Sequence, residues 1–125
     1  FCADEVEEIM IFSELPAKNT KRPLVDFSME EIHASVNPSW TFAPARGAGR
    51  VHPYQSPEGL VRRLIALYTV PGDLVVDPFA GAGTTLSTAV KMERRAIGYE
   101  NDARTAEDAE PAIESSIAKK ERKSR

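Results

Sequence analysis

The chain has 125 residues and a mass of 13.7 kDa, which suits one compact domain or a piece of a larger one. Its 42% hydrophobic and 28% charged content argues against wholesale disorder. A single cysteine, Cys2, excludes an internal disulfide and a cysteine zinc site. No apolar run is long enough to span a membrane, and the net charge of −3 provides no overall basic surface for nucleic acid. The first residue is Phe1 instead of methionine, which favours a fragment or a processed chain.

Residues 1–50 carry few clear signals and are predicted to be loop-rich. The apolar run at residues 9–12 combines β-branched and aromatic side chains, which predicts a short buried strand. Four prolines and two glycines between residues 16 and 49 then interrupt any regular pattern. We expect at most one further short strand there, near residues 36–42.

Residues 51–117 have the signals of an α/β segment, and they begin with a helix. Ser56 is suited to be the N-cap of this helix, with Pro57 at its first helical position. Apolar residues then recur at helical spacing as far as Tyr68. A turn with proline and glycine at its centre follows at residues 70–73.

Strands and helices alternate after this turn. The predicted order is a strand at 74–76, a glycine-rich turn at 79–83, a helix at 84–94, a strand at 95–100 and a helix at 102–117. The first strand is wholly apolar, as expected of a strand covered on both faces. Two parallel strands joined by a right-handed crossover helix form a βαβ unit. The basic residues 118–125 are expected to be a solvated, frayed tail.

A glycine-rich segment, residues 77–85 (DPFAGAGTT), lies where the first strand meets its helix. Doubly wound folds bind ligands at this position, beyond the carboxyl ends of the strands. Gly81 and Gly83 allow close backbone approach, and the helix after them offers free N–H groups. A P-loop is excluded because no Gly-Lys-Ser/Thr follows. A dinucleotide fingerprint fits poorly because Leu86 occupies the third glycine position.

Two carboxylates stand at the ends of the two predicted strands. Asp77 directly precedes the glycines, where it would repel a pyrophosphate and attract an ammonium group. Glu100 ends the second strand, where an acid can accept hydrogen bonds from both hydroxyls of a ribose. S-adenosylmethionine has a ribose, a cationic amine and no phosphate, so it fits both positions. The plainer alternative is that Asp77 only caps the following turn and that Glu100 is a solvated strand end.

The sequence resembles the C-terminal part of the β class of DNA amino-methyltransferases, which methylate N6 of adenine or N4 of cytosine. The motifs that carry the resemblance are residues 52–58 (HPYQSPE), 64–65 (LI), 71–73 (PGD), 76–85 (VDPFAGAGTT) and 97–100 (IGYE). Their order, with the His-Pro element directly before the glycine-rich element, is that of the β arrangement. The resemblance implies a partial Rossmann-like, doubly wound α/β sheet and a cofactor-binding segment at 51–117.

The resemblance also assigns cofactor-binding roles residue by residue. Asp77 would lie by the amino group of S-adenosylmethionine, and Glu100 would hold the ribose. The cofactor-binding residues it implies are His52, Pro53, Tyr54, Gln55, Asp77, Pro78, Phe79, Gly81, Gly83, Thr84, Thr85, Glu100 and Asn101. His52–Gln55, Thr84 and Thr85 would be at the methionine end. Ser56 departs from the pattern, because the family often has lysine there.

The family's catalytic motif, Asp/Asn/Ser-Pro-Pro-aromatic, does not occur in the chain. Its polar groups accept hydrogen bonds from the target amine, while its aromatic ring stacks on a flipped base. The nearest string contains Asn37, Pro38 and Trp40, with serine in place of the second proline. We interpret Trp40 as part of the lead-in to the His-Pro element, and a degenerate catalytic motif is the alternative.

The predicted strand at 74–77 belongs in the middle of a sheet, but the chain offers no second neighbour for it. The missing half would come from a preceding segment, a second chain of a split enzyme, or a homodimer mate. The expected partners are therefore DNA in the complete enzyme and a second chain or homodimer. No metal or membrane is expected, and the location is expected to be cytoplasmic. Two rival interpretations are a non-catalytic remnant or subunit and a piece of a dinucleotide oxidoreductase.

Overall fold

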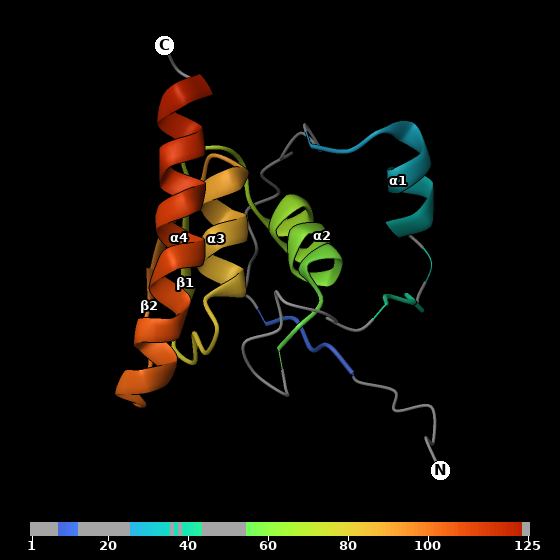
Figure 1. Cartoon of the computed structure of the whole chain (residues 1–125). Coiled ribbons are helices and arrows are strands. Elements are labelled where there is room, and N and C mark those ends of the chain that lie inside the picture. The colour runs from blue at the N-terminus through green and yellow to red at the C-terminus, as the bar shows by residue number, and fades with distance from the viewer. Residues whose placement is uncertain (1–7, 13–25, 36, 38, 44–54, 124–125) are drawn as a thin grey trace.

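The computed structural model describes residues 8–12, 26–35, 37, 39–43 and 55–123. Figure 1 shows the elements in chain order. They are α1 (Met29–Ser35), α2 (Glu58–Tyr68), β1 (Leu74–Asp77), α3 (Thr84–Lys91), β2 (Arg95–Gly98) and α4 (Ala103–Lys123). The described part of the chain is thus mixed α/β, with its regular structure concentrated after residue 57.

The two strands form a parallel sheet with α3 as the crossover between them. Leu74 pairs with Arg95, and the register continues to Asp77 opposite Gly98. The N–H groups of Arg95 and Tyr99 donate to the carbonyls of Asp73 and Asp77, at 2.8 and 3.0 Å. The predicted parallel βαβ unit is therefore confirmed.

Three helices form one layer on one face of this sheet. In Figure 1, α3 and α4 lie in front of the strands, and α2 packs beside α3. The core of this layer comes from α2, both strands, and α3 with the residue that follows it. Its buried and half-buried members are Val61, Ile65, Val75, Ala89, Met92 and Ala96. Apolar residues at helical spacing in α2 thus meet the inward-facing residues of the strands, as amphipathic packing requires.

The opposite face of the sheet is exposed. Leu74, Val76 and Ile97 point away from the helix layer, and each is more than two-fifths exposed. The prediction of a first strand covered on both faces is wrong for this chain, because no described residue packs on that side. The apolar composition of the strand is what a two-sided environment demands, but the described part of the chain provides only one of the two sides.

The N-terminal expectations are also corrected. Residues 9–12 form no strand, and their side chains are exposed. No strand forms at residues 37 and 39–42, the described part of the second expected strand. Instead α1 is present, and its start is a capping box: Glu31 N–H donates to Ser28 Oγ at 3.2 Å, while Ser28 N–H donates to Glu31 Oε2 at 2.9 Å. The Ser-x-x-Glu spacing was the sequence signal for this helix.

Several element boundaries differ from prediction: β2, for example, ends at Gly98 and not at residue 100. Helix α2 begins at Glu58, with Pro57 as N-cap and no side-chain capping bond, so Ser56 is not its cap. Helix α3 ends at Lys91, because Glu93 adopts a left-handed conformation with φ 66°. Helix α4 continues into the basic segment as far as Lys123, beyond its expected end at residue 117.

Arg94 connects distant parts of the described chain. Its side chain is fully buried and donates to Thr69 Oγ1 at 2.9 Å, to Met92 O at 2.6 Å and to Thr69 O at 2.8 Å. It also forms an ion pair of 2.6 Å with Asp26, 68 positions earlier. These four hydrogen bonds, one of them to a carboxylate, are how the protein accommodates the buried charge.

Candidate functional site

The glycine-rich turn after β1 is tied to the end of β2. Ala80 N–H donates to Tyr99 O at 2.9 Å, and Gly83 N–H donates to Ala80 O at 2.8 Å. Gly81 and Gly83 have φ of 50° and 71°, a left-handed conformation that costs a residue with a Cβ roughly 1–2 kcal/mol. The two glycines therefore let the chain turn sharply from the strand end into the N-terminus of α3.

Glu100 joins the end of β2 to this turn. Its Oε2 accepts the Gly81 N–H at 2.8 Å, and its Oε1 accepts the Asp102 N–H at 2.9 Å. The backbone N–H groups of Asp102 and Gly81 hold the pKa of Glu100 below its ordinary value, so the group is ionised at neutral pH. A carboxylate has about four acceptor sites, which leaves room for hydroxyl donors of a ligand.

Asp77 occupies the corresponding position at the end of β1. Its Oδ1 accepts the Phe79 N–H at 3.0 Å, which closes an Asx turn. Asp77 therefore caps the turn that follows β1, as the plainer interpretation of the sequence predicted. It does not exclude a ligand role, because Asp77 also lines a hollow beside the turn.

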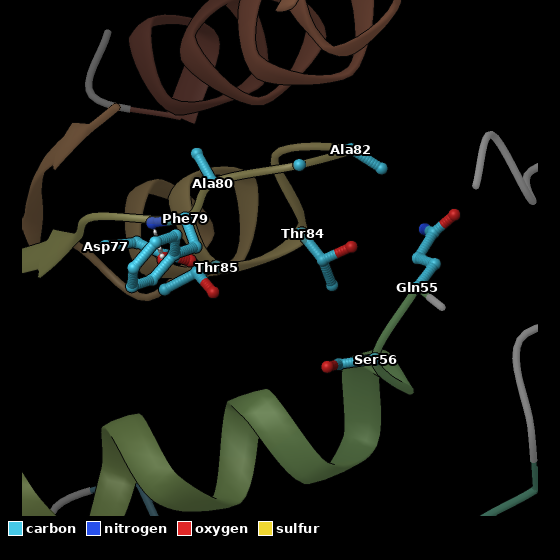
Figure 2. Close-up of a pocket in the computed structure, with 9 residues that line it drawn as sticks. Gln55, Ser56, Asp77, Phe79, Ala80, Ala82, Thr84 and Thr85 are labelled. Carbon is cyan, nitrogen blue, oxygen red and sulfur yellow. Dashed lines mark hydrogen bonds between the residues drawn. The ribbon is translucent and has the colours of Figure 1, made fainter. Parts of the chain in front are cut away.

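Phe79, which is 87% exposed, lines two separate hollows. Figure 2 shows the first, with Ser56 on the α2 side and Phe79, Thr84 and Thr85 opposite. The residues that line it are Gln55, Ser56, Asp77, Phe79, Ala80, Gly81, Ala82, Thr84 and Thr85. The second hollow is lined by Pro78, Phe79, Tyr99, Glu100 and Asn101. Each hollow thus contains one of the two strand-end carboxylates.

The first hollow also has hydrogen-bonding capacity of its own. It lies at the N-terminus of α3, where backbone N–H groups lack partners within the helix. The hydroxyl of Thr84 is buried there, and no described residue hydrogen-bonds it. This end of the site is suited to an anionic or hydrogen-bonding ligand group.

Most of the predicted cofactor residues in the described part of the chain come together around these hollows. Gly83 lines neither hollow; it lies under α4 instead, where an added Cβ would be 3.0 Å from Ile113 Cδ1. His52, Pro53 and Tyr54 lie outside the described residues. Sequence reasoning missed Ser56, Ala80, Ala82 and Tyr99 as lining residues. Tyr99 could have been found, because it directly precedes Glu100 at the strand end.

The alternative catalytic string lies away from both hollows. Asn37 Oδ1 accepts the Ser39 N–H at 3.2 Å, which closes a local turn. The Trp40 ring packs edge-on against Phe42, with centroids 6.4 Å apart, and the Arg63 guanidinium lies 5.1 Å from its centre. Pro38 lies outside the described residues. Neither Asn37 nor Trp40 lines either hollow, which favours the lead-in interpretation of this string.

Neither a metal centre nor a membrane span is found among the described residues. They contain no group of three or more histidine, cysteine or acidic side chains that could hold a metal ion. None of their helices is both long and apolar enough to cross a lipid bilayer.

Two adjacent parallel strands, joined by a crossover helix and followed at their carboxyl ends by a glycine-rich turn and an acidic residue, place the described residues in the α/β class. The chain belongs to the N6/N4 DNA methylase family, whose model matches residues 3–111. It is 32% identical to the Type II methyltransferase M.MjaI of Methanocaldococcus jannaschii, over 95% of this chain and 41% of that protein. It is 49% identical to the DNA adenine methyltransferase YhdJ of Escherichia coli K12, over 64% of this chain and 27% of that protein.

Solved structures agree with this assignment. A protein of Thermus thermophilus, described as a DNA modification methylase and complexed with S-adenosyl-L-methionine, superposes with a TM-score of 0.63 and 31% identity. The match covers 75% of this chain and 36% of that protein. The chain therefore has a partial Rossmann-like fold of the methyltransferase type, and it spans about two-fifths or less of these relatives' lengths.

Proposed function

We propose that this chain is the S-adenosylmethionine-binding portion of a DNA methyltransferase that acts on an exocyclic amine, adenine N6 or cytosine N4. The observation that carries the proposal is the pair of strand-end carboxylates, Asp77 and Glu100, one in each hollow beside the glycine turn. A relative with the same fold is complexed with this cofactor.

The chain's residues match the parts of this cofactor by their chemistry. Ionised Glu100 would accept hydrogen bonds from the ribose hydroxyls, and Asp77 would attract the ammonium group. The α3 N-terminus and Thr84 would face the carboxylate of the methionine end. Phe79, which lines both hollows, would contact the middle of the cofactor. When bound, the cofactor supplies a sulfonium methyl group for transfer to an amine.

The complete enzyme needs parts that this chain does not contain. No Asp/Asn-Pro-Pro-aromatic motif is present to accept hydrogen bonds from the target amine. We therefore propose DNA as the substrate of the complete, cytoplasmic enzyme, and a second chain or a homodimer as the partner that completes the sheet. The absent motif also favours the second candidate function, a non-catalytic subunit that binds cofactor.

Calorimetric titration of the chain with S-adenosylmethionine and with its demethylated product tests the cofactor site. We expect weak binding, and a further loss of about tenfold or more in Asp77→Ala and Glu100→Ala, because each removes a charge-assisted contact. Glu107→Ala is the matched control, since this exposed acid on α4 lies away from both hollows. Binding that survives both site substitutions unchanged would show that the cofactor lies elsewhere.

Transfer of tritiated methyl groups to duplex DNA tests whether the chain is active by itself. We expect no turnover on adenine- or cytosine-containing duplexes, because the chain lacks the Asp/Asn/Ser-Pro-Pro-aromatic motif that would hold the flipped base and its amine. Clear turnover that is lost in Asn37→Ala would instead identify residues 37–40 as the catalytic motif.

A further inference from the structure

The two hollows of the candidate site carry acidic side chains and no basic one. Asp77 lines the first hollow and Glu100 lines the second, and no lysine, arginine or histidine among the described residues lines either. The backbone N–H groups of Asp102 and Gly81 lower the pKa of Glu100, so this acid is charged at neutral pH. The described part of the site therefore has a net negative charge.

Basic side chains on the neighbouring helices do not neutralise this charge. Lys91, at the end of α3, forms an exposed ion pair of 2.7 Å with Glu58. Arg104, in the first turn of α4, is exposed and lines neither hollow. It also follows Asp102, a further acid whose pKa is lowered by the Thr105 backbone N–H. The carboxyl-end edge of the sheet thus presents a negative field to a ligand.

The proposed cofactor and its product differ by one charge. When the methyl group is transferred, the amine nitrogen bonds to the methyl carbon, the S–C electron pair stays on sulfur, and a proton leaves the amine. The positive sulfonium of S-adenosylmethionine thereby becomes the neutral thioether of S-adenosylhomocysteine. The ammonium, the carboxylate, the ribose and the adenine are the same in both molecules. Only the surroundings of the sulfur can therefore distinguish the cofactor from its product.

The sulfur lies between the two groups that the carboxylates would hold. Both hollows include Phe79, so one extended ligand can occupy both of them. In the cofactor, the sulfur is equally few bonds away from the ammonium group, proposed at Asp77, and from the nearer ribose hydroxyl, proposed at Glu100. Opposite charges several Å apart near a protein surface change an affinity by roughly tenfold. The exposed ring of Phe79 also attracts a cation more than a neutral group.

We infer that Asp77 and Glu100 together make this site select the positively charged sulfonium over the neutral thioether, so that the product of methyl transfer is held more weakly than the cofactor. The inference rests on the proposed function and adds the specificity of the same site. The α3 N-terminus and the buried Thr84 hydroxyl would face the methionine carboxylate, which both molecules carry, so they do not contribute to the selection. Weak product binding would free the site after each transfer and limit inhibition by the product.

The ratio of the two dissociation constants, measured by calorimetry on the 125-residue chain, tests the selection. We expect S-adenosylmethionine to bind about tenfold more tightly than S-adenosylhomocysteine. Asp77→Asn and Glu100→Gln should each lower this ratio about threefold, and the double variant should bring it close to one. Both substitutions keep an oxygen that can accept a backbone N–H, from Phe79 or from Gly81. Glu107→Gln, at an exposed acid that lines neither hollow, is the matched control and should leave the ratio unchanged.

The ratio separates charge selection from a structural role of the two acids. A distorted site weakens both ligands alike and leaves the ratio as it was, whereas a lost carboxylate weakens the sulfonium form more. Raising the salt concentration from about 20 to 500 mM should also lower the parent ratio, because salt screens exposed charges. Equal affinities in the parent chain, or a ratio that the double variant leaves unchanged, would overturn the inference while the proposed function stands. Binding of neither molecule would overturn the proposed function, and the inference with it.

Discussion

Gly83 shows how one residue without a side chain holds the candidate site together. Its φ of 71° is left-handed, and a Cβ there would lie 3.0 Å from Ile113 Cδ1 and 3.2 Å from Ala109 Cβ. We expect Gly83→Ala to lower the free energy of unfolding by about 1–3 kcal/mol, because backbone strain and crowding against α4 act together. Urea denaturation measures the change.

Gly72 is the matched control for this residue-scale prediction. Its φ is 90°, but no atom lies within 4 Å of the position of an added Cβ. Gly72→Ala should therefore carry only the backbone cost, about 1 kcal/mol. Equal losses at both positions would mean that the contact between the turn and α4 contributes nothing to stability.

At the scale of elements, α1 begins with a capping box that protonation of the Glu31 carboxylate should weaken. The backbone N–H of Ser28, followed by weaker contacts with Arg62, lowers the pKa of Glu31 below its ordinary value of 4.5. A lowered carboxyl pKa stabilises the folded form above the ordinary value, and this stabilisation is lost as the pH falls through the lowered value. Helix α1 should therefore be intact at pH 6 and should fray as the pH falls below about 4.5.

Carbon chemical shifts of residues 29–35 follow this fraying directly. Glu31→Gln removes the titrating charge, so its α1 shifts should vary less with pH between 6 and 3 than those of the parent chain. Ser28→Ala should cost the helix about 1 kcal/mol at every pH. Parent shifts that stay constant down to pH 3 would contradict the assigned role of the Glu31 carboxylate.

At the scale of the whole molecule, Arg94 links the segment around Asp26 to the α/β unit through a buried ion pair. Arg94→Ala removes four hydrogen bonds and leaves Asp26 and two carbonyls without their partner. We expect it to lower the free energy of unfolding by about 3–5 kcal/mol, the cost of breaking a buried pair. Asp26→Ala should cost less, because Arg94 keeps its bonds to Thr69 and Met92 and because Asp26 is partly exposed. Thermal melts of both variants give the ranking, and the reverse order would refute it.

Local signals in the sequence were sufficient for the βαβ unit and its ligand turn. Proline and glycine mark the turn before β1, apolar periodicity marks α2, and the glycines after Asp77 mark the strand end; each acts over a few residues of chain. Parallel strands then bring their carboxyl ends to one edge, so the sequence alone could place Asp77 and Glu100 at the same edge of the sheet. The Ser28-x-x-Glu31 pattern of the capping box is equally local, so the sequence also contains the signal for the start of α1.

Only the tertiary structure decided what depends on contacts far apart in the sequence. The bond of Glu100 to Gly81 spans 19 positions, and the ion pair of Arg94 with Asp26 spans 68. Nothing local distinguishes a half-covered strand from a fully covered one, because the apolar residues of β1 are the same in both cases. Burial depends on which other elements are present. Only the placement of the helices therefore shows that the second face of the sheet, with Leu74, Val76 and Ile97, is exposed among the described residues.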